Sequence, residues 1–155
     1  MKRLLKPGGI LVIYDLEMAL WMRDGTNPWD SIPTVCFFTD CVNRVLLGQG
    51  IDVSKMPLTG QWIREIGGFT DIDDLVISIP IGEWVRDDEY QRELGAMARD
   101  NIYSATFAIQ PMLHRMGKTQ EEIEQLSESS RLELYSGMEL FERLFYVFAR
   151  RTEDD

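Results

Sequence analysis

Two carboxylates and two tryptophans stand close together in the sequence after an apolar run at 10–14. Asp15 and Glu17 follow that run directly, and a carboxylate can take a proton from a nucleophile. Trp21 and Trp29 come next, and pockets for apolar ligands are rich in aromatic side chains. We therefore expect Asp15, Glu17, Trp21 and Trp29 to contact a substrate. The alternatives are that the carboxylates are merely solvated side chains at a strand end and that the tryptophans pack on the rim of the domain.

Other reactive residue types give weaker predictions. His114 has a side chain that can act as a base near neutral pH, but it follows a proline at an expected helix end, so an exposed or structural role is the alternative. Cys36 and Cys41 are spaced so that a helix turns them away from each other, and we expect buried thiols with no disulfide. The acidic residues at 71–74 are typical of a solvated link. We expect no metal site.

The elements that would position the candidate residues begin with the segment 3–15. Arg3 to Leu5 are predicted to be the last turn of a helix, with basic residues at its negative end. Pro7 ends this helix, and two glycines form a turn. The run at 10–14 shows no alternation, which predicts a strand buried on both faces. Ligands bind beyond the carboxyl ends of strands in open α/β sheets, so the site is expected at 15–21, followed by a loop at 21–30.

The rest of the chain is predicted to be mostly helical. A helix is expected at 33–47, capped by Asp30 or Ser31, and another at 57–66, closed by two glycines. Leu75 to Ile79 are predicted to be a second buried strand. Helices are then expected through 87–135, divided near Pro111 and including a capping box of Thr119 and Glu122. The aromatic and β-branched content of 144–149 predicts a third strand.

Composition excludes several functional classes. The chain has 155 residues, a formal net charge of −10 and 45% hydrophobic residues. This is enough for one domain with a real core. The acidic balance argues against a nucleic-acid groove or an anionic membrane surface as partner. No stretch reaches the roughly 20 apolar residues that a membrane helix needs. Since no targeting signal is recognisable, an intracellular location, cytoplasmic or nuclear, is expected.

Several segments in this order resemble one enzyme family. Lys6-Pro7-Gly8-Gly9 before an apolar strand with an acidic end resembles the fifth-strand unit of class I S-adenosylmethionine-dependent methyltransferases. The helix closed by Gly67-Gly68-Phe69 resembles the sixth-strand unit, and the last strand ending in two arginines resembles the seventh. Ile79-Pro80-Ile81-Gly82-Glu83-Trp84 and the helix with Glu93-Leu94-Gly95 are similar to segments of LaeA-like fungal methyltransferases. One departure is Glu139-Leu140-Phe141, which stands where members often have His-x-Tyr.

The resemblance implies a partial Rossmann-like α/β fold, helix-rich, with strands five, six and seven. Residues 1–155 would form the C-terminal, substrate-side part of a methyltransferase domain, with a helical insertion at about 87–135. The seventh strand, antiparallel, would lie between the fifth and sixth. No cofactor-binding residue is identified in this chain, since Gly48-Gln49-Gly50 follows a helix and not a strand. S-adenosylmethionine is implied as the cofactor by the resemblance alone.

Two functions follow as expectations. By resemblance, the chain belongs to a methyltransferase that acts on a small molecule of secondary metabolism or on a protein, and it is expected to be truncated and inactive alone. The alternative is a non-catalytic interaction or regulatory module derived from such an enzyme. In either case one side of the fifth strand would be unpaired. A protein supplying the missing half of the sheet, or self-association, is therefore expected.

Overall fold

A three-stranded sheet with helices gathered at one end makes up the computed structural model, which describes residues 4–153. The strands have the order β1-β3-β2, and β3 is antiparallel to both neighbours, so β1 and β2 run in the same direction. This order and these directions are the ones that the resemblance implies. The elements are β1 (Ile10–Met22), α1 (Pro28–Ser31), α2 (Pro33–Gly48), the 3-10 helix η2 (Val53–Leu58), α3 (Thr59–Ile66), β2 (Phe69–Ile81), α4 (Glu89–Ala108), α5 (Gln110–Arg115), α6 (Gln120–Leu134) and β3 (Leu140–Arg151).

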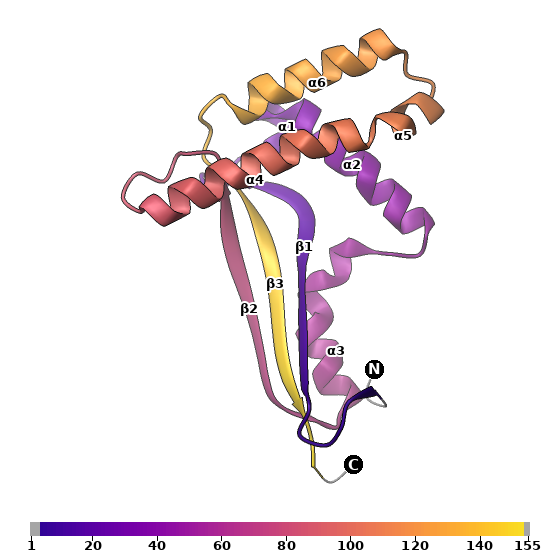
Figure 1. Cartoon of the computed structure of the whole chain (residues 1–155), viewed down its shortest axis with the longest axis vertical. Coiled ribbons are helices and arrows are strands. Elements are labelled where there is room, and N and C mark those ends of the chain that lie inside the picture. The colour runs from indigo at the N-terminus through magenta and orange to yellow at the C-terminus, as the bar shows by residue number, and fades with distance from the viewer. Residues whose placement is uncertain (1–3, 154–155) are drawn as a thin grey trace.

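The helices divide into two groups around the sheet (Figure 1). Most of them lie across the end where β1 and β2 finish and β3 begins, and α3 lies beside the sheet towards the opposite end, near both termini. The helical group packs on Ile32, Val35, Ile81, Leu134 and Leu140, all of which are buried. A separate cluster joins Ile63 of α3 to Val147 and Ala149 of β3. The molecule is therefore a mixed α/β structure in which the helical group covers one end of the sheet.

Strand β1 differs from the sequence prediction in its length. It was expected to end at Asp15, but it continues to Met22, and Asp15 lies opposite Phe145 in the middle of the ladder. The pairing with β3 shifts between Leu16 and Leu20, where Met18 has a φ of 52°. The carboxyl end of the strand is thus moved beyond the predicted site because the ladder with β3 resumes after this bulge.

The prediction of strands buried on both faces was wrong. On β1, Ile10, Val12 and Tyr14 are 49%, 45% and 70% exposed, and on β2, Leu75 and Ile77 are 55% and 45% exposed. α3 contacts β2 and β3, and Leu11 and Ile13 pack against its buried cluster, whereas the residues that alternate with them are left exposed. β1 and β2 are also the edge strands of this sheet. Central β3 alone keeps a buried series of Phe145, Val147 and Ala149.

The helix predictions were mostly confirmed, apart from one cap. The capping box of Thr119 and Glu122 is present, and Pro111 stands at the start of α5, where the long helical segment divides. Neither Asp30 nor Ser31 caps α2. Instead, the Glu133 carboxylate of α6 accepts hydrogen bonds from the backbone N–H groups of Thr34 and Val35, at 3.0 and 2.9 Å. The expected helical turn at 3–5 begins outside the described residues, while Gly8 has the predicted positive φ, 73°.

Neither a membrane-crossing helix nor a cluster of metal-binding side chains is found within residues 4–153. None of the helices in the described part of the chain has both the length and the apolar content needed to cross a membrane. Among the same residues, no group of three or more His, Cys, Asp or Glu side chains is arranged to hold a metal ion.

Candidate functional site

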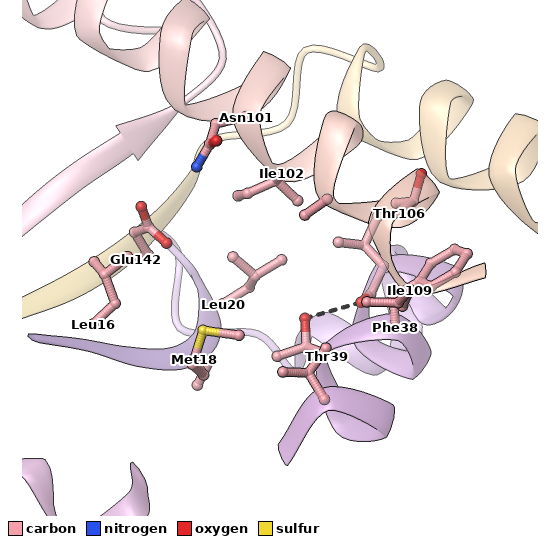
Figure 2. A pocket seen from close by; sticks show the side chains of 14 residues that line it. Leu16, Met18, Leu20, Phe38, Thr39, Asn101, Ile102, Thr106, Ile109 and Glu142 are labelled. Carbon is pink, nitrogen blue, oxygen red and sulfur yellow. Dashed lines mark hydrogen bonds between the residues drawn. The ribbon is translucent and has the colours of Figure 1, made fainter. Parts of the chain in front are cut away.

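An open, mainly apolar cavity of about 140 Å³ lies between the last part of β1, helix α2 and helix α4. It is at the end of the sheet where β1 and β2 finish. Ligands bind at that end in open α/β sheets. Apolar side chains supply most of the lining (Figure 2). The lining residues are Leu16, Met18, Ala19, Leu20, Val35, Phe38, Thr39, Val42, Asn101, Ile102, Ala105, Thr106, Ile109 and Glu142.

Glu142 is the one titratable side chain among the described residues that line this cavity. It comes from β3, where it pairs with Leu20 of β1 and Ile79 of β2. Burial raises the pKa of the Glu142 carboxyl above its ordinary value of 4.5, because the charged form loses water without gaining a counterion. The cavity therefore holds a carboxyl group that is harder to ionise than a surface glutamate.

The bulge of β1 forms one wall of the cavity. Asn43 of α2 donates from Nδ2 to the Met18 carbonyl oxygen at 3.0 Å, which holds the bulge against the helix. The Oδ1 atom of Asn43 is buried and has no hydrogen-bond partner among the described residues. The positive φ of Met18 is one that L-residues other than glycine seldom adopt. Strained backbone of this kind is often found near functional sites.

A second cavity of about 300 Å³ lies on the other side of the bulge. It shares Met18, Ala19, Leu20 and Thr39 with the first cavity. Trp21 and Trp29 both line it, together with Cys36, Asp40 and Asn43. The two predicted tryptophans are therefore brought together on one cavity, although each ring is also substantially exposed, at 38% and 49%.

The two predicted carboxylates lie outside both cavities. Asp15 is exposed and accepts a hydrogen bond from the N–H of Leu16. Glu17 binds Arg143 through both of its oxygens, at 2.5 Å each, and also accepts from Trp21 Nε1 at 3.0 Å. The Arg143 guanidinium in turn stacks 4.0 Å from the centre of the Trp21 ring. Glu17 therefore fixes the orientation of Trp21, and its oxygens are already occupied by hydrogen bonds.

The histidine and the two cysteines do not line the cavity that holds Glu142. His114 is exposed, with its ring nitrogens near the Lys118 carbonyl and the Gln120 side chain. Cys36 and Cys41 are free and buried, as predicted. Burial, with a smaller contribution from the charge of Glu133, raises the pKa of the Cys36 thiol to about 11. This thiol therefore stays protonated and unreactive near neutral pH.

The acidic residues at 71–74 lie within β2, not in a link before it. Asp74 pairs with Arg64 of α3 at 2.8 Å, and Asp71 pairs with Arg150 of β3 at 3.1 Å. Two arginine hydrogen bonds hold the pKa of Asp74 below its usual range. These carboxylates join α3 and β3 to the strand, and they do not form a ligand site.

Sequence reasoning missed Glu142 and Asn101, the two polar residues at one end of the first cavity. Glu142 lies close to several other charged residues in the sequence, and Asn101 is a polar residue on a helix with many others. Only the packing of α4 across the end of the sheet brings them together (Figure 2). The available signal was a charged residue at the start of a strand of apolar residues, because such a position requires either a partner or a cavity.

Comparisons with known proteins identify one kind of relative. The chain is 29% identical over 131 residues to Methyltransferase pytC of Aspergillus terreus, covering 83% of this chain and 39% of that protein. It is 28% identical over 134 residues to Methyltransferase pytC of the strain A. terreus NIH 2624, with the same shares covered. No family model matches the chain. The sequence thus has a distant similarity to a fungal methyltransferase over most of its length, and it spans about two fifths of the relatives it matches.

Proposed function

We propose that this chain is the acceptor-binding, C-terminal part of an S-adenosylmethionine-dependent methyltransferase with a class I, Rossmann-like fold, of the LaeA-like type. The observation that carries the proposal is the strand order β1-β3-β2, with β3 antiparallel between two strands that run the same way. This is the arrangement that the family has for strands five, seven and six. The similarity to a fungal methyltransferase over 83% of the chain supports the same assignment.

The residues of this chain do not fit S-adenosylmethionine on their own. β1 is followed by a short loop and the four-residue helix α1, without a glycine-rich turn. Gly48 and Gly50 stand at the end of α2 and the start of a loop, where a positive φ of 82° at Gly50 ends the helix. The cofactor would therefore be held by a polypeptide segment other than this one, and the chain alone is expected to be inactive.

The acceptor is proposed to be a small molecule, in line with a role in secondary metabolism. Concave, mainly apolar sites with a few polar groups are typical of small-molecule binding. The cavity with Glu142 and the neighbouring cavity with Trp21 and Trp29 both have this character. Trp21 and Trp29 are retained as substrate contacts. Asp15 and Glu17 are proposed to act only at the rim, since neither is in the lining of these two cavities.

Titration with S-adenosylmethionine tests the assignment. The purified chain is expected to show no binding by calorimetry. A chimera in which this chain replaces the matching 39% of the A. terreus methyltransferase is expected to bind the cofactor. The native A. terreus protein is the control. A folded chimera that fails to bind would contradict the methyltransferase assignment, and tight binding by the chain alone would contradict its description as the acceptor part only.

The second candidate function is a non-catalytic interaction module. The exposed apolar residues of β1 and β2 favour it, because edge strands with apolar side chains pair readily with other chains. Under this proposal the chimera would fold without binding the cofactor, while the chain would still associate with a partner through β1.

A further inference from the structure

Glu142 differs from the other partly buried carboxylates of the described residues because no hydrogen-bond donor of the protein reaches its oxygens. Glu17 binds Arg143, and Glu133 accepts two backbone N–H groups of α2. By contrast, the Glu142 carboxylate has no hydrogen bond or ion pair with any residue in 4–153. Its oxygens are not among the fully buried polar atoms that lack a partner, so they are accessible to a ligand that enters the cavity.

The polar and apolar parts of the cavity are separated. Figure 2 shows Glu142 and Asn101 on the same side, whereas Phe38 and Ile109 lie at the opposite end. The hydroxyls of Thr39 and Thr106, two further lining residues, donate to the backbone carbonyls of Val35 and Tyr103, at 3.0 and 2.7 Å. The cavity thus presents the Glu142 carboxyl and the Asn101 amide at one end and mainly apolar side chains elsewhere.

The size of the cavity limits what it can hold. Its volume is about 140 Å³. An apolar protein cavity of about 150 Å³ lined by Leu, Ile and Phe is large enough to bind benzene. The lining here also includes Leu20, Ile102 and Phe38. One six-membered ring with a small substituent is therefore the largest rigid unit that fits, and any larger substituent must extend through the open side.

We propose that this cavity binds a monocyclic aromatic ring carrying a hydroxyl group, and that Glu142 accepts the hydrogen bond from that hydroxyl. The inference rests on the proposed function in taking this ligand as the methyl acceptor. A hydroxyl fits better than an ammonium group, because it can donate to the carboxyl in either protonation state, whereas an ion pair would require both charges to be desolvated. Asn101 lines the same end of the cavity.

Binding of phenol and toluene, followed by NMR titration of the isotope-labelled chain, tests the proposal. The two rings have nearly the same shape, and only phenol has a donor. Glu142→Leu removes the acceptor, so the ratio of phenol affinity to toluene affinity is expected to fall about tenfold, as for loss of a hydrogen bond to a charged group. Glu93→Gln, an exposed change on α4, is expected to leave the ratio unchanged.

Filling the cavity gives a second, independent variant. Ala105 lines the cavity from an exposed position on α4, so Ala105→Leu is expected to fold normally. This variant is expected to lose the binding of both rings. Retained binding in Ala105→Leu would place the ligand elsewhere and overturn the proposal. An unchanged phenol-to-toluene ratio in Glu142→Leu, or a tenfold preference of the wild type for benzylamine over phenol, would also overturn it.

These measurements need no cofactor, so they are separable from the test of the proposed function. Ring binding that depends on Glu142 supports the site even if the chimera does not bind S-adenosylmethionine. Cofactor binding by the chimera without any ring binding by the chain would overturn the site and leave the methyltransferase assignment standing.

Discussion

Four glutamates in this protein have different structural roles, and the role of each depends on the residues around it. Glu133 supplies the N-terminal cap of α2 from a different helix, and Glu122 completes the capping box of its own helix. Glu17 orients Trp21 together with Arg143. Glu142 alone faces a cavity. Since all four are the same residue type, the neighbours that each side chain meets determine its role.

The cap supplied by Glu133 predicts a specific loss of stability. Glu133→Ala leaves the N–H groups of Thr34 and Val35 without their acceptor, so the free energy of unfolding is expected to fall by about 1 kcal/mol, as for other lost N-caps. Urea denaturation followed by circular dichroism measures this. Glu128→Ala, which removes only an exposed pair with Arg131, is the control and is expected to cost less. Equal effects would show that Glu133 does not cap α2.

Glu142 predicts a pH dependence of stability. Because burial raises its pKa in the folded state above 4.5, the folded protein binds this proton more tightly than the unfolded chain. The resulting stability is present below about pH 4.5 and is lost as pH rises through the raised pKa. Glu142→Gln removes the titration, so its stability relative to the wild type is expected to increase between pH 4.5 and 7.

The charges around Glu142 do not complicate this prediction. The described residues of β1, α2 and α4 that line the cavity contribute no other titratable group, and the neighbouring Arg143 is directed to Glu17. Thermal unfolding across this pH range is the measurement, with Glu93→Gln as the control for loss of one charge. A constant difference between Glu142→Gln and the wild type at every pH would contradict the burial of the carboxyl.

Among the elements, α4 depends on a close backbone approach to the turn after β2. Gly95 accepts a hydrogen bond from the Gly82 N–H at 2.8 Å, and a Cβ atom at Gly95 would overlap with the Gly82 carbonyl oxygen. Gly95→Ala must push α4 away from the sheet, so we expect a loss of about 2–3 kcal/mol in the free energy of unfolding. The cavity against α4 should widen as well.

Gly48→Ala is the matched control for this variant. A Cβ atom there would meet nothing within 4 Å, and alanine favours a helical conformation, so stability is expected to be unchanged or to rise by about 0.4–1 kcal/mol. If Gly95→Ala and Gly48→Ala unfold at the same denaturant concentration, the contact between α4 and the turn is looser than described.

Features set by nearby residues could be predicted from the sequence, and features set by distant residues could not. The capping box of Thr119 and Glu122 is complete within four residues, and it was predicted correctly. The cap of α2 comes from Glu133, about a hundred positions away, and no local pattern indicates it. In the same way, β1 passes Asp15 because β3 pairs with it again at Leu20, so its end is decided by the partner strand.

In the candidate site, too, features set by nearby residues could be predicted and features set by distant residues could not. Trp21 and Trp29 were predicted as substrate contacts from their local spacing, and they line one cavity together. That assignment remains a prediction. The cavity with Glu142 combines β1, α2, α4 and β3, and its polar end exists only because α4 crosses the end of the sheet. The packing of α4 across the sheet cannot be predicted from local sequence patterns.

For the whole molecule, the exposed apolar side of the sheet predicts association. Ile10, Val12 and Tyr14 lie along edge strand β1, with exposed fractions between 45% and 70%. An unpaired edge of this kind recruits further strands. Sedimentation velocity of the chain alone is therefore expected to show concentration-dependent oligomers. The variant Val12→Lys is expected to shift the distribution towards the monomer, while Leu132→Lys on exposed α6 is the control. A stable wild-type monomer would contradict this prediction.

The order of the strands also has a consequence for synthesis on the ribosome. β1 and β2 do not pair with each other, and both need β3, which is the last of the three to be made. Until β3 leaves the exit tunnel, the nascent chain carries two apolar segments without any ladder partner. Contacts between residues so far apart form slowly, and transiently unpaired strands are prone to aggregation. The demand on chaperones should therefore be highest just before β3 has been synthesised, and a premature stop codon ahead of Leu140 would leave β1 and β2 without the strand that pairs with both.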